Sequence, residues 1–174
     1  REIMPILKNP QEKYIVLHLR GGDKALDTDP NKNGSKDKDV YVANLIDKLN
    51  SSLKKHETNN IVVISDSDYL VDEFNDKFIN DDNNNLYNIF YSDILRLPKK
   101  VNEIGIHKIP KKVLKENNIS KNVILDNNFI DFYTLLMSDD IITDGISNFS
   151  GVSTNIKNSL NNKKDYSMGL FFER

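Results

Sequence analysis

Apolar residues along the chain alternate between short continuous runs and longer segments with helical spacing. Residues 14–19, 61–64, 86–91 and 140–143 form runs of strand length, and the segment 40–55 carries apolar residues three or four positions apart. Continuous apolar runs are typical of strands buried on both faces, and their alternation with helices predicts βαβ units. We therefore predict an α/β fold with a Rossmann-like parallel sheet and helices on both faces.

Four more helices are predicted around this sheet. One carries Leu70, Val71, Phe74 and Phe78 on one face, and a last one is marked by Val152, Ile156 and Leu160. Val113 and Leu114 indicate a further short helix, and residues 168–172 form a final strand or a docked tail. A long helix is placed to begin at Asp131, and we expect its apolar stripe to lie in the core. The members of that stripe are Phe129, Phe132, Tyr133, Leu136 and Met137.

Composition narrows the class of protein. The 174 residues suffice for one domain, and the formal net charge of −2 does not favour a nucleic-acid partner. The chain has no cysteine, which excludes disulfides and thiolate chemistry. It shows neither a signal peptide nor an apolar run of about 18–20 residues, so we expect no integral membrane segment and favour the cytoplasm. Because the first residue is Arg1, we expect a longer parent chain.

Polar residues follow the predicted strands, where open α/β sheets bind ligands. His18 and Arg20 end the first strand and, being two residues apart, share one face. A planar guanidinium suits a diphosphate, and Gly21 with Gly22 would let a ligand approach the backbone closely. A plainer interpretation is that Arg20 reaches solvent and pairs with Asp23.

Two later segments add to this picture. The second strand ends at Asp66 within a Ser-Asp-Ser-Asp sequence, and the last helix begins near Ser147, Asn148 and Ser150. Hydroxyl groups and unpaired backbone amides at a helix start are suited to an anionic ligand. The residue pattern thus favours a phosphate-bearing ligand at the ends of the strands.

The same segments resemble a known family. Residues 18–23 resemble the His-x-Arg-Arg-x-Asp sequence of the α-1,2-, α-1,6- and O-fucosyltransferases, and residues 65–68 resemble their Ser-Asp-Asp segment. Residues 131–137 resemble the family's Asp-Leu-x-x-Met segment, and residues 147–150 its Ser-x-Phe-Ser turn. The four matches occur in the family's order, between about residues 14 and 156.

The resemblance implies the donor-binding half of a GT-B glycosyltransferase, spanning residues 1–174. In such an enzyme His18 and Asp131 would hydrogen-bond guanine, and Arg20 would hold the β-phosphate as the catalytic cation. Ser147, Asn148 and Ser150 would line the phosphate site. The implied reaction moves a deoxy-hexose, fucose from GDP-fucose, to a glycan hydroxyl. The family uses neither a metal nor another cofactor, because arginine and helix-end amides offset the leaving-group charge.

The chain departs from the family pattern in two ways. Gly21 stands where the family usually has a second arginine, so another nucleotide deoxy-sugar such as a rhamnose donor stays open. Residues 1–13 cannot supply the acceptor-binding lobe, so the chain is a fragment or another chain completes the cleft. The general base is not assigned. Asp23 and Asp66, the carboxylates nearest the expected site, are counted among the substrate-binding residues and are interpreted as structural rather than as the base.

Two other classes of protein stay open: a non-catalytic α/β module that binds a nucleotide or a partner, and an unrelated α/β enzyme with a phosphate site. Residues 29–40 imitate an EF-hand loop, but Lys36 and Val40 do not fit it, so we expect no calcium site. We expect no zinc site, because the histidines are few and far apart, and His56 and His107 are expected to be solvated. The chain also lacks Gly-x-Gly-x-x-Gly, P-loop and nucleophile-elbow sequences.

Overall fold

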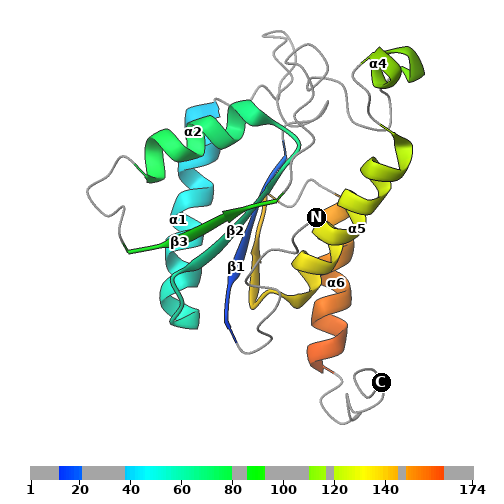
Figure 1. The fold of residues 1–174 in the computed structure, drawn as a ribbon. Coiled ribbons are helices and arrows are strands. Elements are labelled where there is room, and N and C mark those ends of the chain that lie inside the picture. Colours follow the sequence, from blue (N-terminus) through cyan, green and yellow to red (C-terminus); the bar gives the residue numbers. More distant parts are fainter. Residues whose placement is uncertain are drawn as a thin grey trace, which may run out of the picture.

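In the computed structural model a parallel sheet lies between two layers of helices (Figure 1). The residues that the structure describes are 12–20, 38–79, 86–92, 110–116, 120–144 and 148–162. The strands are β1 (Ile15–Leu19), β2 (Asn60–Ser65), β3 (Asn88–Tyr91) and β4 (Asp140–Ile142). The helices are α1 (Lys38–His56), α2 (Asp68–Phe78), α4 (Lys111–Glu116), α5 (Lys121–Met137) and α6 (Asn148–Asn162).

The four described strands are all parallel and follow the order β3-β2-β1-β4. The central strand β1 pairs on both sides, with Leu17 opposite Val63 of β2 and Ile142 of β4. The chain builds outward from β1 through β2 to β3 and then returns to place β4 on the other side of β1. This is the strand order of a Rossmann-like sheet, so the predicted fold class is confirmed.

One face of the sheet is covered by α1 and α2 (Figure 1). Alternate residues of β1, among them Ile15 and Leu17, point to this side and are fully buried. Phe74 of α2 is also fully buried, and its ring stacks on that of Phe78 with centroids 5.0 Å apart. The apolar spacing that predicted these two helices is therefore the spacing of the residues that cover the sheet.

The opposite face of the sheet is covered by α5 and α6 (Figure 1). Val16 of β1 and Tyr14, which directly precedes this strand, pack here against Leu135 of α5, and Phe149 of α6 adjoins the same cluster. The Tyr14 hydroxyl donates a 3.0 Å hydrogen bond to the carbonyl of Thr134, which fastens α5 to the sheet. Since side chains alternate along a strand, His18 continues this face toward the end of β1.

The turn from β2 into α2 is held by two serines. The Ser65 hydroxyl accepts from the backbone N–H of Ser67 at 3.0 Å and donates to the Ser67 carbonyl at 3.1 Å. Ser67 is the N-cap of α2, and its side chain accepts from the N–H of Leu70 at 3.4 Å. Because both serines are buried, the intervening Asp66 is held in a defined position at the end of β2.

The prediction that the long helix begins at Asp131 is wrong. α5 begins at Lys121, so Asp131 lies within the helix rather than at its start. Ser120, a residue type common at helix starts, precedes α5, and its carbonyl accepts from the N–H of Ile124 at 3.4 Å. The apolar residues 123–125 extend the helix toward its start, which moves that start away from Asp131.

The prediction that the aromatic stripe of this helix is core is also wrong for most of its members. Phe129, Tyr133 and Met137 are 71%, 49% and 42% exposed, whereas Leu135 is fully buried. The physical reason is that apolar residues occur on every side of α5 and the sheet can cover only one of them. The predicted short helix at Val113 and Leu114 is confirmed as α4, and residues 168–172 lie outside the described part of the chain.

Glu57 ends α1 in a left-handed conformation, with φ of 53°. The N–H of the next residue, Thr58, donates to the carbonyl of Leu53 at 3.2 Å, which closes the helix end. Glycine adopts this conformation without a steric penalty, so Glu57→Gly is expected to raise the free energy of unfolding by about 0.5–1 kcal/mol. Urea denaturation measures the change, with Glu57→Ala as the control that should bring no such gain.

Candidate functional site

Charged and polar side chains meet at the carboxyl ends of β1, β2 and β4. Arg20 follows β1, Asp66 follows β2 and Asp144 follows β4. Strand order reverses between β1 and β4, and in open α/β sheets ligands bind in the crevice at such a point. The fold therefore places these residues where a Rossmann-like domain binds its ligand.

Arg20 is held by contacts on both its side chain and its backbone. Its Nη1 lies 3.0 Å from Oδ2 of Asp66, and the two side chains are 30% and 13% exposed. Its backbone N–H donates to the hydroxyl of Tyr41 at 3.3 Å. Tyr41 comes from the first turn of α1 and is buried. Its burial, which is the largest cause, and the negative charge of Asp144 raise the pKa of its hydroxyl well above the usual range. The tyrosine hydroxyl thus stays protonated beside the arginine.

His18 is two residues before Arg20 in the chain and lies on the face of the sheet that α5 and α6 cover. It is almost fully buried, and its ring is 6.0 Å from the ring of Phe149. Burial lowers its pKa from 6.5 to about 4, although the carboxylates of Asp66 and Asp144 act in the opposite direction. The imidazole is therefore neutral at neutral pH. Among the described residues, no hydrogen-bond partner reaches its Nδ1 atom.

Hydroxyl groups at the start of α6 join that helix to β4. The hydroxyls of Thr143 and Ser150 share a hydrogen bond of 3.1 Å, and Ser150 is fully buried. Within α6 the hydroxyl of Thr154 donates to the carbonyl of Ser150 at 2.8 Å. In this arrangement the Ser150 hydroxyl fixes the helix start against the sheet instead of facing solvent.

The structure brings together several of the residues that the sequence singled out. His18, Arg20 and Asp66 lie at one site, and Ser150 follows Phe149, whose ring adjoins His18. Asp131 is half-buried within α5. The ring of its neighbour Phe132 packs edge-on against the ring of Phe149, with centroids 5.7 Å apart. Because the Phe149 ring in turn adjoins His18, these aromatic rings connect α5 to the site. Gly21, Gly22, Asp23 and Ser147 lie outside the described residues, and Asn148 begins α6.

Tyr41 was missed by the sequence analysis, although a signal for it exists. It stands four residues before Leu45 and eight before Leu49, so it belongs to the buried stripe of α1. A tyrosine in the first turn of a buried helix face carries a hydroxyl that must find a polar partner. Because helix starts and strand ends meet at this edge of the sheet, that partner is the backbone of Arg20.

The charge balance of this site matters for any anionic ligand. The described charged groups are one guanidinium, on Arg20, and two carboxylates, on Asp66 and Asp144. Arg20 is therefore already neutralised by Asp66. A phosphate that binds here must take the place of the Asp66 carboxylate beside Arg20, or bind together with a further cation.

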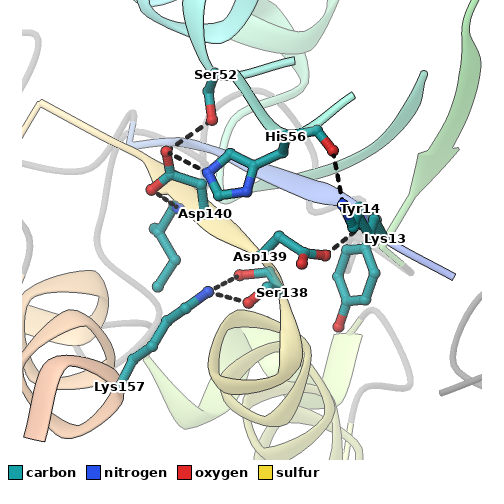
Figure 2. A network of polar contacts seen from close by, with 9 residues as sticks. Lys13, Tyr14, Ser52, His56, Ser138, Asp139, Asp140 and Lys157 are labelled. Atoms are coloured by element: carbon teal, nitrogen blue, oxygen red, sulfur yellow. Dashed lines mark hydrogen bonds and ion pairs between the residues drawn. The ribbon is translucent and has the colours of Figure 1, made fainter. Parts of the chain in front are cut away.

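A second polar network lies at the opposite ends of β1 and β4 (Figure 2). Asp140 accepts from the Ser52 hydroxyl at 2.7 Å, and its Oδ2 lies 3.7 Å from Nε2 of His56. His56, which we expected to be solvated, is instead 22% exposed and turned toward this carboxylate. Lys157 of α6 donates to the carbonyl and the hydroxyl of Ser138. This network fastens the end of α1 and the body of α6 to β4.

The contacts of the second network indicate a structural role rather than a catalytic one. Burial lowers the pKa of Lys157, while Asp139 and Asp140 act against this change. The Ser52 hydroxyl donates to Asp140 and so does not face His56 as a nucleophile would face its base. An open depression of about 370 Å³ lies nearby, between α1 and β4, and is lined by Lys48, Lys55, Ile142 and neighbouring polar side chains.

The chain shows no significant similarity to a known protein that would assign its function, since no known family, curated protein or solved structure matches it. Within the described residues, no group of three or more histidine, cysteine or acidic side chains is placed to hold a metal ion. No described helix combines the length and the apolar character that crossing a membrane requires.

Proposed function

We propose that the chain binds a nucleoside diphosphate sugar and is the donor half of a fucosyltransferase-like glycosyltransferase. The observation that carries this proposal is the placement of His18 and Arg20 at the end of the central strand, at the point where strand order reverses. The buried, neutral imidazole of His18 offers a hydrogen-bonding group for the nucleobase, and the partly exposed guanidinium of Arg20 offers one for a phosphate. The sequence resemblance to fucosyltransferases supports the same interpretation.

In this proposal the diphosphate takes the place of Asp66 beside Arg20. An acceptor hydroxyl attacks the anomeric carbon of the deoxy-hexose, the bond from that carbon to the β-phosphate oxygen breaks, and the nucleoside diphosphate leaves. Arg20 stabilises the negative charge that develops on the leaving phosphate, without a metal. The glycan acceptor is bound by a second lobe, supplied by the rest of a longer chain, and a general base that we do not assign removes the hydroxyl proton.

The test is isothermal titration of the chain with GDP, GDP-fucose and UDP. We expect one nucleotide to bind and Arg20→Ala to weaken that binding at least about 10-fold, since a hydrogen-bonded charge pair contributes about 1.5–3 kcal/mol. Lys48→Ala is the matched control, because this lysine is exposed on α1 and should leave the affinity unchanged. Binding that survives in Arg20→Ala, or no binding of any nucleotide, contradicts the proposal.

The variant Asp66→Asn tests whether Asp66 competes with the diphosphate for Arg20 or itself contacts the donor. If Asp66 competes with the diphosphate for Arg20, the amide should leave Arg20 available and tighten nucleotide binding several-fold, more at low than at high salt. If Asp66 instead binds the sugar or the base, the same variant should weaken binding of the complete donor. Far-ultraviolet circular dichroism and the urea midpoint show whether each variant is folded.

The second candidate function is a non-catalytic α/β module, and the Arg20–Asp66 ion pair favours it. A guanidinium neutralised by a carboxylate 3.0 Å away is the arrangement of a structural ion pair at a strand end. The two candidates differ in turnover. Release of GDP from GDP-fucose by the full-length protein in the presence of glycan acceptors supports the transferase, whereas nucleotide binding without such release supports the module.

A further inference from the structure

The outward side of α5 carries an apolar surface that nothing in the described part of the chain covers. We call this surface the α5 stripe, and its members are 38% to 71% exposed. Apart from the adjacent Phe129 and Ile130, successive members stand three or four residues apart, so all five lie within one side of the helix. The stripe consists of Leu125, Phe129, Ile130, Tyr133 and Met137.

The neighbouring helix α6 also exposes apolar residues. Val152 and Ile156 of α6 are also exposed, and α5 and α6 pack against each other. At roughly 150–250 Å² for a fully exposed large side chain, these seven residues leave on the order of 700 Å² of apolar surface open to solvent. The five residues of the α5 stripe alone supply roughly 500 Å² of this surface by the same measure, in the upper part of the about 300–600 Å² of the largest apolar patch on a typical monomer. The exposed residues of both helices together approach the roughly 800 Å² that each partner contributes to a stable interface.

Few charged residues interrupt this surface. The 17 residues of α5 and the 15 residues of α6 contain four charged side chains, whereas charged residues make up 29% of the whole chain. Depletion of charge together with aromatic residues and methionine is the composition of an interface core. The four charged residues are Lys121, Asp126, Asp131 and Lys157.

We propose that the α5 stripe is the interface of a homodimer. A surface with few charges can face its own copy without like-charge repulsion, and an isologous contact about a two-fold axis requires such self-complementarity. The scarcity of lysine and arginine gives an anionic membrane nothing to attract. The helix is apolar on both sides because one side covers the sheet of its own chain and the other covers the partner. This inference is independent of the proposed function.

Sedimentation velocity of the chain over a range of concentrations tests this directly. We expect a concentration-dependent species of twice the 20.0 kDa mass of one chain. Phe129→Glu should raise the dimer dissociation constant at least about 30-fold, the effect of losing a buried aromatic anchor. Val40→Glu is the matched control, because Val40 is also apolar and is 54% exposed, but lies on α1, so the variant should keep the wild-type dissociation constant.

Single-cysteine variants provide a second measurement, since the chain has no cysteine of its own. Phe129→Cys and Tyr133→Cys should form disulfide-linked dimers under mild oxidation, whereas Val40→Cys should stay unlinked. A wild-type chain that is monomeric at all concentrations overturns the proposal. Binding of this monomer to neutral vesicles would mean that the stripe contacts lipid instead of a second copy. A dimer that persists in Phe129→Glu, or a longer parent protein that is monomeric because other residues cover the stripe, overturns it as well.

Discussion

Lowering the pH from about 7 to about 4 is expected to remove on the order of 3 kcal/mol of folding stability through His18 alone. Burial lowers the pKa of this imidazole from 6.5 to about 4. Each unit of difference between the unfolded and folded pKa corresponds to about 1.4 kcal/mol. The buried position at the end of the central strand thus makes acid sensitivity a property of the proposed site.

The sign follows from proton uptake. Between pH 6.5 and pH 4 the unfolded chain binds a proton at His18 and the folded chain does not, so acid favours the unfolded state. The stability is fully present above about pH 6.5 and falls as the pH approaches 4. Below about pH 4 both states are protonated at this residue and the loss through His18 stops.

Urea denaturation at several pH values, for the wild type and for His18→Leu, isolates this contribution. The carboxylates titrate in both proteins, so the difference between their free energies of unfolding should change by about 3 kcal/mol between pH 7 and pH 4. An NMR titration of the three histidines should also find one imidazole that stays neutral down to about pH 4. A difference that does not vary with pH, or three histidines that all titrate near 6.5, contradicts the prediction.

Phe74→Ala is expected to lower the free energy of unfolding by about 3–5 kcal/mol, because it leaves a large cavity beside the sheet. Phe74 is fully buried, and its ring stacks on Phe78. The same substitution at Phe129, a residue of identical chemistry that is 71% exposed, should change the stability of the monomer by no more than about 0.5 kcal/mol.

The comparison requires protein concentrations well below the dimer dissociation constant, because dimerisation would add to the apparent stability. Urea midpoints and slopes for the two variants and the wild type supply the values. Equal losses in Phe74→Ala and Phe129→Ala would mean that the α5 stripe is buried within the monomer. That result would contradict both the exposure of the helix and the dimer proposal.

Much of the fold could be predicted because the strands carry their own pattern. The run Ile61–Ile64 is apolar at every position, which is typical of a strand covered on both faces by helices. Helices α1 and α2 were placed correctly because each has one apolar side and one polar side. The position of the proposed site also followed from the pattern, since parallel strands end at one edge and polar residues follow each of them.

Helix α5 shows where pattern analysis fails. When apolar residues surround a helix, spacing shows neither which side meets the sheet nor where the helix begins. Phe129 and Leu135 have similar hydrophobicity, yet one is exposed and the other is fully buried. The Arg20–Asp66 pair likewise joins the ends of two strands far apart in sequence, and residue spacing alone does not indicate this pairing.

Local residue order was therefore enough to establish an α/β domain with a polar edge, because strand and helix periodicities are properties of neighbouring residues. Which carboxylate neutralises Arg20, which ring covers His18 and which side of α5 stays open depend on how separate elements pack. Packing is a matter of long-range contacts, and these arise only when the sheet assembles.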